Sequence, residues 1–394
     1  MTNQVKSFTH KYYLFQFFGN FAFFSPVIVL FWQANGLNMA QIMLLQSIYA
    51  IGVSLLELPT GAFADIFGKK KSLFLGAFFW VVGFLWYSQS HLFWQFVIGE
   101  ITAGVGAAFI SGADRSYLHE LLREEKSEQL FNAVEGKARG IAQVAQAMGS
   151  VFGGLIANVS LAGTLIATSL ANAINAGVII TFPSVKKEYG KSDSFFARIV
   201  ESVVLVRKHL ALLWYVVFFA TIYALIWPLQ FYAQTYLQLL QIPVYLFGFI
   251  FMGINLIAAW GMTFTHRLDT FLKNKLFGVI STVVVVTLAI LALFPHYFLL
   301  PLWSLFMMAV FVLQTVISGR MLLIVPFEKT ATVLSLQSLL RRLIYAAIIP
   351  FLGIVTDTWG IQKGLVGYAV FMGVILAVIL LTQRKSLGYM ESSA

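Results

Sequence analysis

Two carboxylates stand inside stretches of the chain that are otherwise apolar. Glu57 belongs to the stretch 41–64, and Glu100 lies eight residues into the stretch 92–113. A carboxylate at the centre of a membrane helix costs roughly 2.5–3.5 kcal/mol on insertion scales, so each of these residues calls for an explanation. At 1.5 Å per residue, Glu100 lies about 12 Å from the outer end of its stretch. The chemistry that they predict is proton uptake and release, with Glu100 as the leading carrier.

Basic side chains are available as partners for these acids. Arg139 lies in the inner third of the fifth apolar stretch, and Arg342 takes the corresponding place in the eleventh. A cation that approaches a buried carboxylate favours its charged form, so Arg139 joins Glu57 and Glu100 as a proton-coupling candidate. The alternative is that each acid forms a fixed salt bridge that only holds helices together.

The elements that must position these residues are membrane helices. The chain has 394 residues, of which 59% are hydrophobic and 11% charged, and its mean hydropathy is +0.84. Such a composition excludes an ordinary soluble globular protein. A spanning helix needs roughly 20 apolar residues. Twelve spans satisfy this length: 10–34, 41–64, 72–89, 92–113, 135–158, 161–182, 210–236, 243–265, 276–294, 297–318, 332–355 and 362–383. We therefore predict an all-α membrane protein with twelve transmembrane helices.

The net charge of +10 is explained by membrane orientation. With both termini in the cytoplasm, nearly all lysines and arginines flank inner loops, and only Lys363 falls in an outer loop, as the positive-inside rule requires. The basic residues do not gather on one soluble module, so we expect no nucleic-acid partner. Cysteine is absent, which excludes thiol chemistry and thiolate metal sites. The first apolar run is too long for a signal-peptide core and is read as an uncleaved helix.

A polar interruption between the second and third spans has an ordered pattern. It contains Gly61, Asp65, Gly68, Lys69 and Lys70, with the second glycine placed where a tight reversal is needed. This pattern resembles motif A of the major facilitator superfamily. The resemblance implies a cytoplasmic hinge in which the acid stabilises the outward-facing conformation. The alternative is a solvated loop acid.

The end of the fourth span could contact this hinge. Asp114 and Arg115 follow directly on the apolar stretch, and we include them with the hinge residues as a conformational gate. A solvated ion pair between the two is an equally good interpretation.

Two further motifs of the family are matched in part. The family's fourth helix carries an arginine before its two glycines, whereas this chain has Glu100 there, so a relay through that arginine is not carried over. The fifth span holds Gly140, Gly149, Gly153 and Gly154 at spacings similar to motif C of the exporters, without its proline. The match favours export, while close packing of small residues explains the same glycines equally well.

The longest polar connection, 184–209, divides the chain into two halves, 1–183 and 210–394. Several positions recur about two hundred residues later, such as Gly153 and Gly353. We predict two six-helix bundles with a substrate cavity between them near the midplane. Polar and aromatic side chains at helical spacing are its expected lining: Gln16, Asn20, Tyr223, Trp227, Gln230, Gln234, Asn255 and Gln314.

These observations predict a secondary transporter that exports small hydrophobic or drug-like molecules in exchange for protons. A dedicated carrier for a sugar, amino acid, nucleoside or siderophore is the alternative within transport, and a sensor or scramblase is the alternative outside it. No nucleotide-binding loop, nucleophile elbow or histidine-acid metal pattern is present in the sequence, so we expect no enzyme activity, no metal and no cofactor beyond the proton gradient. We expect a monomer in a bacterial inner membrane, bound only to lipid and its small-molecule substrate.

Overall fold

The computed structural model describes residues 3–183, 203–325 and 327–391, so most of the predicted linker 184–209 lies outside the described residues. Every long element in the described ranges is an α-helix, which confirms the predicted all-α class. The helices are α1 (Asn3–Gly19), α2 (Ile28–Ala34), α3 (Met39–Phe67), α4 (Lys69–Ser88), α5 (Phe93–Glu124), α6 (Phe131–Ala157), α7 (Leu161–Ile180), α9 (Leu210–Ile226), α10 (Leu229–Leu239), α11 (Val244–Met262), α12 (Thr265–Leu272), α13 (Leu276–Leu293), α14 (Ser304–Leu322) and α15 (Phe327–Glu391), with 3-10 turns at Glu128–Leu130, Lys273–Lys275 and Tyr297–Trp303.

Ten helical segments in the described part are long and apolar enough to cross a membrane. The predicted first span, 10–34, differs from the expectation because its helix stops at Gly19 and resumes only at Ile28. The last two predicted spans both lie in α15. The helical backbone of α15 is interrupted at Gly360, where φ is 79°. The count of twelve and the cytoplasmic termini stay predictions.

The chain divides into two compact units. Unit 1 comprises 1–37, 48–191 and 242–252, and unit 2 comprises 38–47, 192–241 and 253–394. The first residues of α3 therefore belong with unit 2, and the first residues of α11 with unit 1. The halves predicted from the sequence did not include this exchange of short segments.

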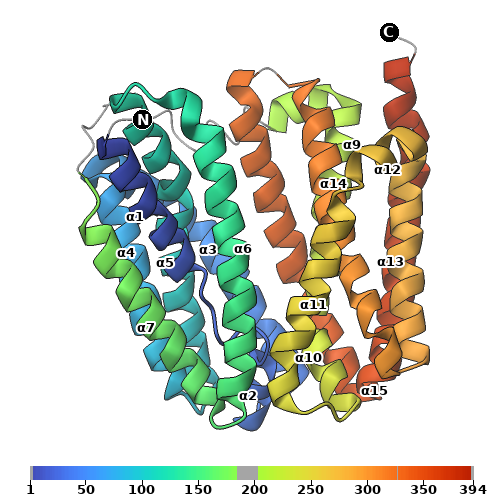
Figure 1. Ribbon diagram of the computed structural model, residues 1–394. Coiled ribbons are helices and arrows are strands. Elements are labelled where there is room, and N and C mark those ends of the chain that lie inside the picture. The colour runs from blue at the N-terminus through green and yellow to red at the C-terminus, as the bar shows by residue number, and fades with distance from the viewer. Residues whose placement is uncertain (1–2, 184–202, 326, 392–394) are drawn as a thin grey trace. The chain divides into compact units, whose positions relative to one another are not determined.

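In unit 1, α4 packs against both α5 and α7, while α1 packs against α6 and α7 (Figure 1). The connection from α3 to α4 is a single residue, Gly68, whose φ of 100° and ψ of 142° suit glycine and few other residues. A tight reversal at this glycine is what the hinge motif predicted.

Glycines of α6 lie in contact with the break in the first span. A Cβ added at Gly153 would lie 1.9 Å from the carbonyl oxygen of Phe23, and one at Gly149 would lie 3.0 Å from that of Ala22. The unwound backbone therefore lies directly on the surface of α6. On the α7 side, the Thr168 hydroxyl accepts a hydrogen bond from the Phe23 amide at 3.0 Å.

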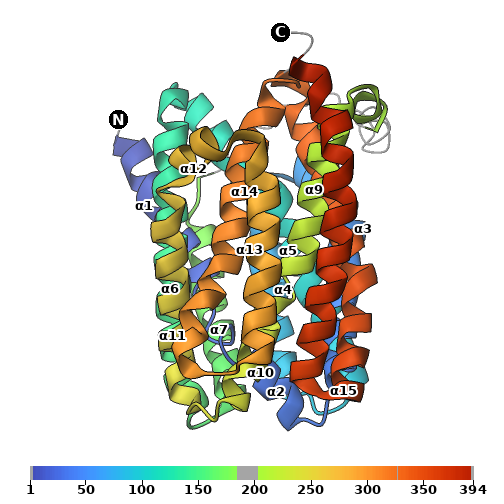
Figure 2. The same ribbon diagram turned by 90° about the vertical axis from the view of Figure 1, so that its right-hand side faces the viewer.

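In unit 2, α15 runs beside α9 and α13 (Figure 2). Near its midpoint, α15 meets the start of α3. Asp357 accepts hydrogen bonds from the backbone N–H groups of Met39 and Ala40 at 2.9 and 2.8 Å, where an acid satisfies free donors of a helix start. A Cβ at Gly353 would lie 2.6 Å from the Ala40 Cα. Gly153 and Gly353, matched in the sequence repeat, thus both allow a close backbone approach.

We predict that Gly153→Ala lowers the thermal stability of the purified protein in detergent. The added methyl group must displace the Phe23 carbonyl, and overpacking of this kind costs about 1–3 kcal/mol. The matched control is Gly140→Ala on the same helix, where no atom lies within 4 Å of the new Cβ and helix propensity gains up to about 1 kcal/mol. Equal melting temperatures for the two variants would contradict the close approach.

Candidate functional site

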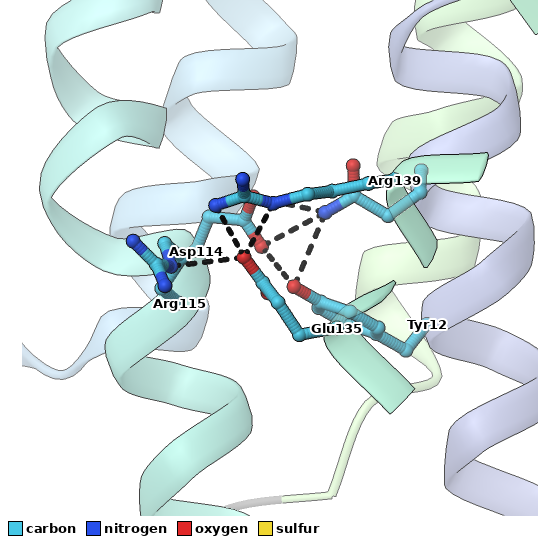
Figure 3. A network of polar contacts seen from close by, with 6 residues as sticks. Tyr12, Asp114, Arg115, Glu135 and Arg139 are labelled. Carbon is cyan, nitrogen blue, oxygen red and sulfur yellow. Dashed lines mark hydrogen bonds and ion pairs between the residues drawn. The ribbon is translucent and has the colours of Figure 1, made fainter. Parts of the chain in front are cut away.

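Six polar side chains from three helices of unit 1 form a connected group (Figure 3). We call it the Glu135 cluster, and it consists of Tyr12 and Gln16 on α1, Asp114 and Arg115 on α5, and Glu135 and Arg139 on α6. The cluster joins the first, fourth and fifth predicted spans.

Glu135 is the centre of the ion pairs in this cluster. Its Oε1 lies 2.9 Å from the Nε of Arg115 and 2.8 Å from an Nη of Arg139, which is one helical turn further along α6. The side chain of Glu135 is 11% exposed, whereas those of Arg115 and Arg139 are 62% and 66% exposed. The carboxylate is therefore buried between two guanidinium groups that reach outward. Removing a partner from such a pair costs more than removing an exposed one, since a buried charge is left behind.

Asp114 is held in a different way. It accepts a hydrogen bond of 2.7 Å from the Tyr12 hydroxyl, and the Gln16 amide donates to its Oδ2 at 2.9 Å. Both donors are neutral. A carboxylate held by neutral donors can take up a proton without breaking an ion pair.

Glu100 occupies a second polar site on α5. It is buried, with 6% of its surface exposed, and its Oε1 accepts a 2.8 Å hydrogen bond from the Tyr87 hydroxyl. The Trp32 indole N–H of α2 in turn donates to the Tyr87 oxygen at 3.1 Å. Glu100 and Asp114 are about 21 Å apart along α5 at 1.5 Å per residue. One unbroken helix therefore holds Glu100 and Asp114 at different depths, and each of the two accepts from a tyrosine.

The structure gives Arg139 a different partner from the one expected. The sequence grouped Arg139 with Glu57 and Glu100, but its ion pair is with Glu135 on its own helix. Glu57 is partly buried, and its Oε1 lies 3.4 Å from the Ser111 hydroxyl. The role of these residues in proton coupling stays a prediction.

The hinge contacts also differ from the expectation for Asp114 and Arg115. Those two residues bind members of the Glu135 cluster, and the hinge contact from α5 is made by Glu120, which forms an ion pair with Lys69. Lys70 donates to the carbonyl oxygens of Ile180 and Phe182 at 2.7 and 2.6 Å.

Two other hinge residues, Asp65 and Gly61, are less closely packed. Asp65 is exposed, and Gly61 approaches Gly112 of α5, where an added Cβ would lie 3.7 Å from the Gly61 Cα. The gating role of the hinge stays a prediction.

The glycines predicted from motif C divide into two kinds. Gly149 and Gly153 contact the unwound backbone, and a Cβ at Gly154 would lie 3.0 Å from the Gly248 nitrogen in unit 1, while Gly140 has open space beside it. Packing accounts for the three that make close contacts.

Two of the expected cavity residues lie in unit 1 and the other six in unit 2. In unit 1, Gln16 binds Asp114, and the Asn20 amide donates to the Gln16 carbonyl oxygen at 2.8 Å just after α1 ends. In unit 2, the rings of Tyr223 and Trp227 stack at 5.0 Å. Of the other four residues, Gln234 is buried, Gln230 is partly buried, and Asn255 and Gln314 are exposed. Their role as a substrate lining stays a prediction.

Sequence reasoning missed three residues that the structure brings into these sites: Tyr12, Tyr87 and Glu135. The spacing of Glu135 and Arg139 at i, i+4 was a usable signal for one ion pair. The tyrosines gave no such signal, because a tyrosine in a membrane helix is far more often a packing residue. Among the described residues, no group of three His, Cys, Asp or Glu residues is arranged to hold a metal ion.

Known proteins similar to this chain are transporters. An uncharacterized transporter of Buchnera aphidicola, BU466, is 33% identical over 100 residues, which are 25% of this chain and 25% of that protein. An uncharacterized MFS-type transporter of Methanocaldococcus jannaschii, MJ1560, is 26% identical over 139 residues, 34% of each chain. The match thus spans a quarter to a third of the length of these curated relatives.

Solved structures share the fold. A bacterial homolog to the human lysosomal transporter Spinster, in an inward-facing and unoccupied conformation, has a TM-score of 0.78 at 14% identity over 98% of each chain. The nucleoside transporter NupG has a TM-score of 0.76 at 14% identity, covering 98% of this chain and all of that one. At such identities the likeness shows the fold alone.

A family model covers most of the chain. The model described as Major Facilitator Superfamily matches residues 13–346, which include the hinge motif and every residue of the Glu135 cluster except Tyr12. Ten apolar helices in the described part agree with a multi-pass membrane protein. The chain therefore belongs to the Major Facilitator Superfamily of transporters.

Proposed function

We propose that the protein is a secondary active transporter that moves a small organic molecule by alternating access, with protons carried by Glu100. The observation that supports this most directly is the buried Glu100 carboxylate, which accepts from Tyr87 inside the apolar bundle. An intramembrane acid is costly and is retained where it serves ion or proton movement. The Tyr87 hydroxyl is a neutral donor, so a proton can be added to Glu100 without breaking this contact.

Asp114 is the second proton site in this proposal. It lies further along the same helix, and its donors, Tyr12 and Gln16, are also neutral. The arginines of the Glu135 cluster beside it are exposed, whereas Glu100 is buried. Two acids at two depths let one proton site face each side of the membrane in turn.

The broken first span connects these two sites to separate helices. Asp114 is bound by residues of α1, whereas the chain of hydrogen bonds from Glu100 reaches Trp32 on α2. Because the helix is interrupted between Gly19 and Ile28, a change at one carboxylate can move its own helix without dragging the other. This gives a physical route from protonation to a conformational change.

Two substrate classes each have an observation in their favour. Export of hydrophobic or drug-like compounds is favoured by the motif C-like glycines, although packing explains most of them. A dedicated metabolite carrier is favoured by the guanidinium of Arg341, which lies 4.1 Å from the ring centroid of Tyr223. NupG, a structural neighbour, is a nucleoside transporter, which fits this second candidate. We place the protein, as a monomer, in a bacterial inner membrane.

We predict that Glu100→Gln abolishes proton binding at this site while leaving the fold intact, because Gln keeps the shape and can still accept from Tyr87. Infrared difference spectra of the purified protein between high and low pH should lose the C=O stretching band of a protonated carboxyl group. In proteoliposomes, pH-driven accumulation of a transported compound should fall by about tenfold or more, equivalent to about 1.4 kcal/mol. Glu124→Gln, an exposed acid on the same helix, is the matched control. An unchanged band and unchanged flux would remove Glu100 from the mechanism.

We predict that Asp114→Asn, which mimics the protonated acid, shifts the balance between conformations. The chain has no cysteine, so Gly140→Cys, exposed on α6, gives a labelling site without background. The rate at which an impermeant maleimide labels this cysteine should change by about fivefold or more in Asp114→Asn, a population shift of about 1 kcal/mol. Glu128→Gln, an exposed acid outside the cluster, should leave the rate unchanged. Equal rates in all variants would argue that Asp114 is only structural.

A further inference from the structure

One face of α7 carries a line of buried polar side chains beside the first span. Thr168, Asn172 and Asn175 follow one another at spacings of four and three residues, and each is at most 1% exposed. The Thr168 hydroxyl accepts from the Phe23 amide at 3.0 Å. A Cβ added at Gly19 would lie 2.9 Å from the Nδ2 of Asn175. We call Thr168, Asn172 and Asn175 the polar strip of α7.

The two asparagines of the polar strip are not fully paired. The Asn172 Nδ2 donates to the Thr168 carbonyl oxygen at 3.0 Å, but its Oδ1 has no partner, and neither polar atom of Asn175 has one. Among the described residues of unit 1, every buried side-chain nitrogen or oxygen without a hydrogen-bond partner belongs to these two asparagines. Packing is a poor explanation for them, because apolar side chains of similar shape would avoid the cost of an unpaired amide.

The backbone beside the polar strip is stretched compared with a helix. Thr168 and Asn175 are about 10 Å apart along α7, and the four residues from Gly19 to Phe23 cover this length. In an α-helix, four residues rise only about 6 Å. Rewinding this segment onto the end of α1 would therefore move the Phe23 backbone about 4 Å along α7, away from Thr168 and toward the level of Asn172.

A rewound segment would need partners that the polar strip has free. Pro26 stops such a helix, because proline has no N–H group to donate to the carbonyl oxygen of Ala22, four residues earlier. The last carbonyl groups of a helix that ends here therefore lack partners within the helix. The Asn175 Nδ2 is a buried donor without a partner on the neighbouring helix, and the two asparagines also offer two unpaired acceptors.

We propose that the polar strip holds the first span in two arrangements. In the stretched one, Phe23 donates to Thr168; in the rewound one, the backbone of residues 19–24 is hydrogen-bonded to Asn172 and Asn175. The asparagines are positioning residues, which act through the backbone and not on substrate or protons. This inference goes beyond the proposed proton sites, and it rests on the proposed alternating access for its use in transport.

Melting temperatures of the full-length purified protein in detergent test the unpaired amide. Asn175→Leu keeps much of the shape, and Asn175→Ala avoids crowding against Gly19; at least one of them should melt about 2 °C or more above the unchanged protein. Thr168→Val should melt lower, because it leaves the buried Phe23 N–H group without its acceptor. An Asn175 amide that is paired through buried water would make both Asn175 variants melt lower, which would overturn the proposal.

Spin labels on either side of the break test the two arrangements directly. The chain has no cysteine, so Leu14→Cys on α1 and Ala34→Cys on α2, both exposed, give two labelling sites without background. Double electron–electron resonance at pH 5 and pH 8 should show two distances that differ by about 4 Å, the length lost on rewinding. Combining Asn172→Leu with Asn175→Leu in the labelled protein should remove the shorter distance.

The matched control is Ser169→Ala on the same helix. Its buried hydroxyl donates to the Val81 carbonyl oxygen of α4, so its loss should leave both distances in place. A single distance at both pH values before any asparagine is changed, or two distances that survive in the combined variant, would overturn the proposal. If the combined variant does not fold, Asn175→Leu alone carries the same comparison.

The distances are measured without substrate, so they separate this inference from the proposed function. Two distances in a protein that shows no counterflow in proteoliposomes would retain the polar strip and count against transport. Unchanged counterflow in a combined variant that has lost the shorter distance would retain transport and overturn the part of the polar strip in it.

Discussion

The constraint on which this structure depends is that a charge inside an apolar bundle must be held by side chains of the same chain. Four of the charged side chains show different contacts: Glu135 lies between two guanidinium groups, Asp114 and Glu100 each accept from a tyrosine hydroxyl, and Arg341 lies over a ring face. The kind of partner decides what each charge can do. A neutral hydroxyl can stay hydrogen-bonded to a carboxyl group in either protonation state, whereas an ion pair needs the charged form. This difference separates Glu135 from the two acids that we assign to proton movement.

Because the first span is broken, the contacts of Asp114 and Glu100 involve two separate helices of that span. Its two helices are bound to different acids on the continuous α5, and its unwound segment rests on Gly149 and Gly153 of α6. Beside the break, the Asn175 amide is fully buried against Gly19. Neither its Nδ2 nor its Oδ1 has a hydrogen-bond partner in the described structure. Such a group costs free energy in this conformation. The break is therefore a place where a second arrangement of the backbone could gain hydrogen bonds that this one lacks.

The sequence predicted much of the fold because its signals are local. Apolar length predicted the spans, and the Gly68 position predicted the reversal between α3 and α4, where the observed φ of 100° requires such a residue. The depth of Glu100 followed from counting residues along one helix. The partners did not follow, since Tyr12 reaches Asp114 and Arg115 reaches Glu135 only through the rotation and packing of separate helices. The break after Gly19 was also missed, because the span was predicted from apolar length alone. Pro26, which lacks the backbone N–H that a helix interior needs, was a usable signal for it.

The two units carry different charged groups but share one packing feature. Gly153 in unit 1 and Gly353 in unit 2 occupy matched positions, and each lets a neighbouring backbone approach more closely than any side chain would permit. The charged groups have diverged around this shared feature. Unit 1 carries the acids with neutral donors, and unit 2 carries an arginine on stacked rings. The two acids that we propose as proton sites therefore both lie in unit 1.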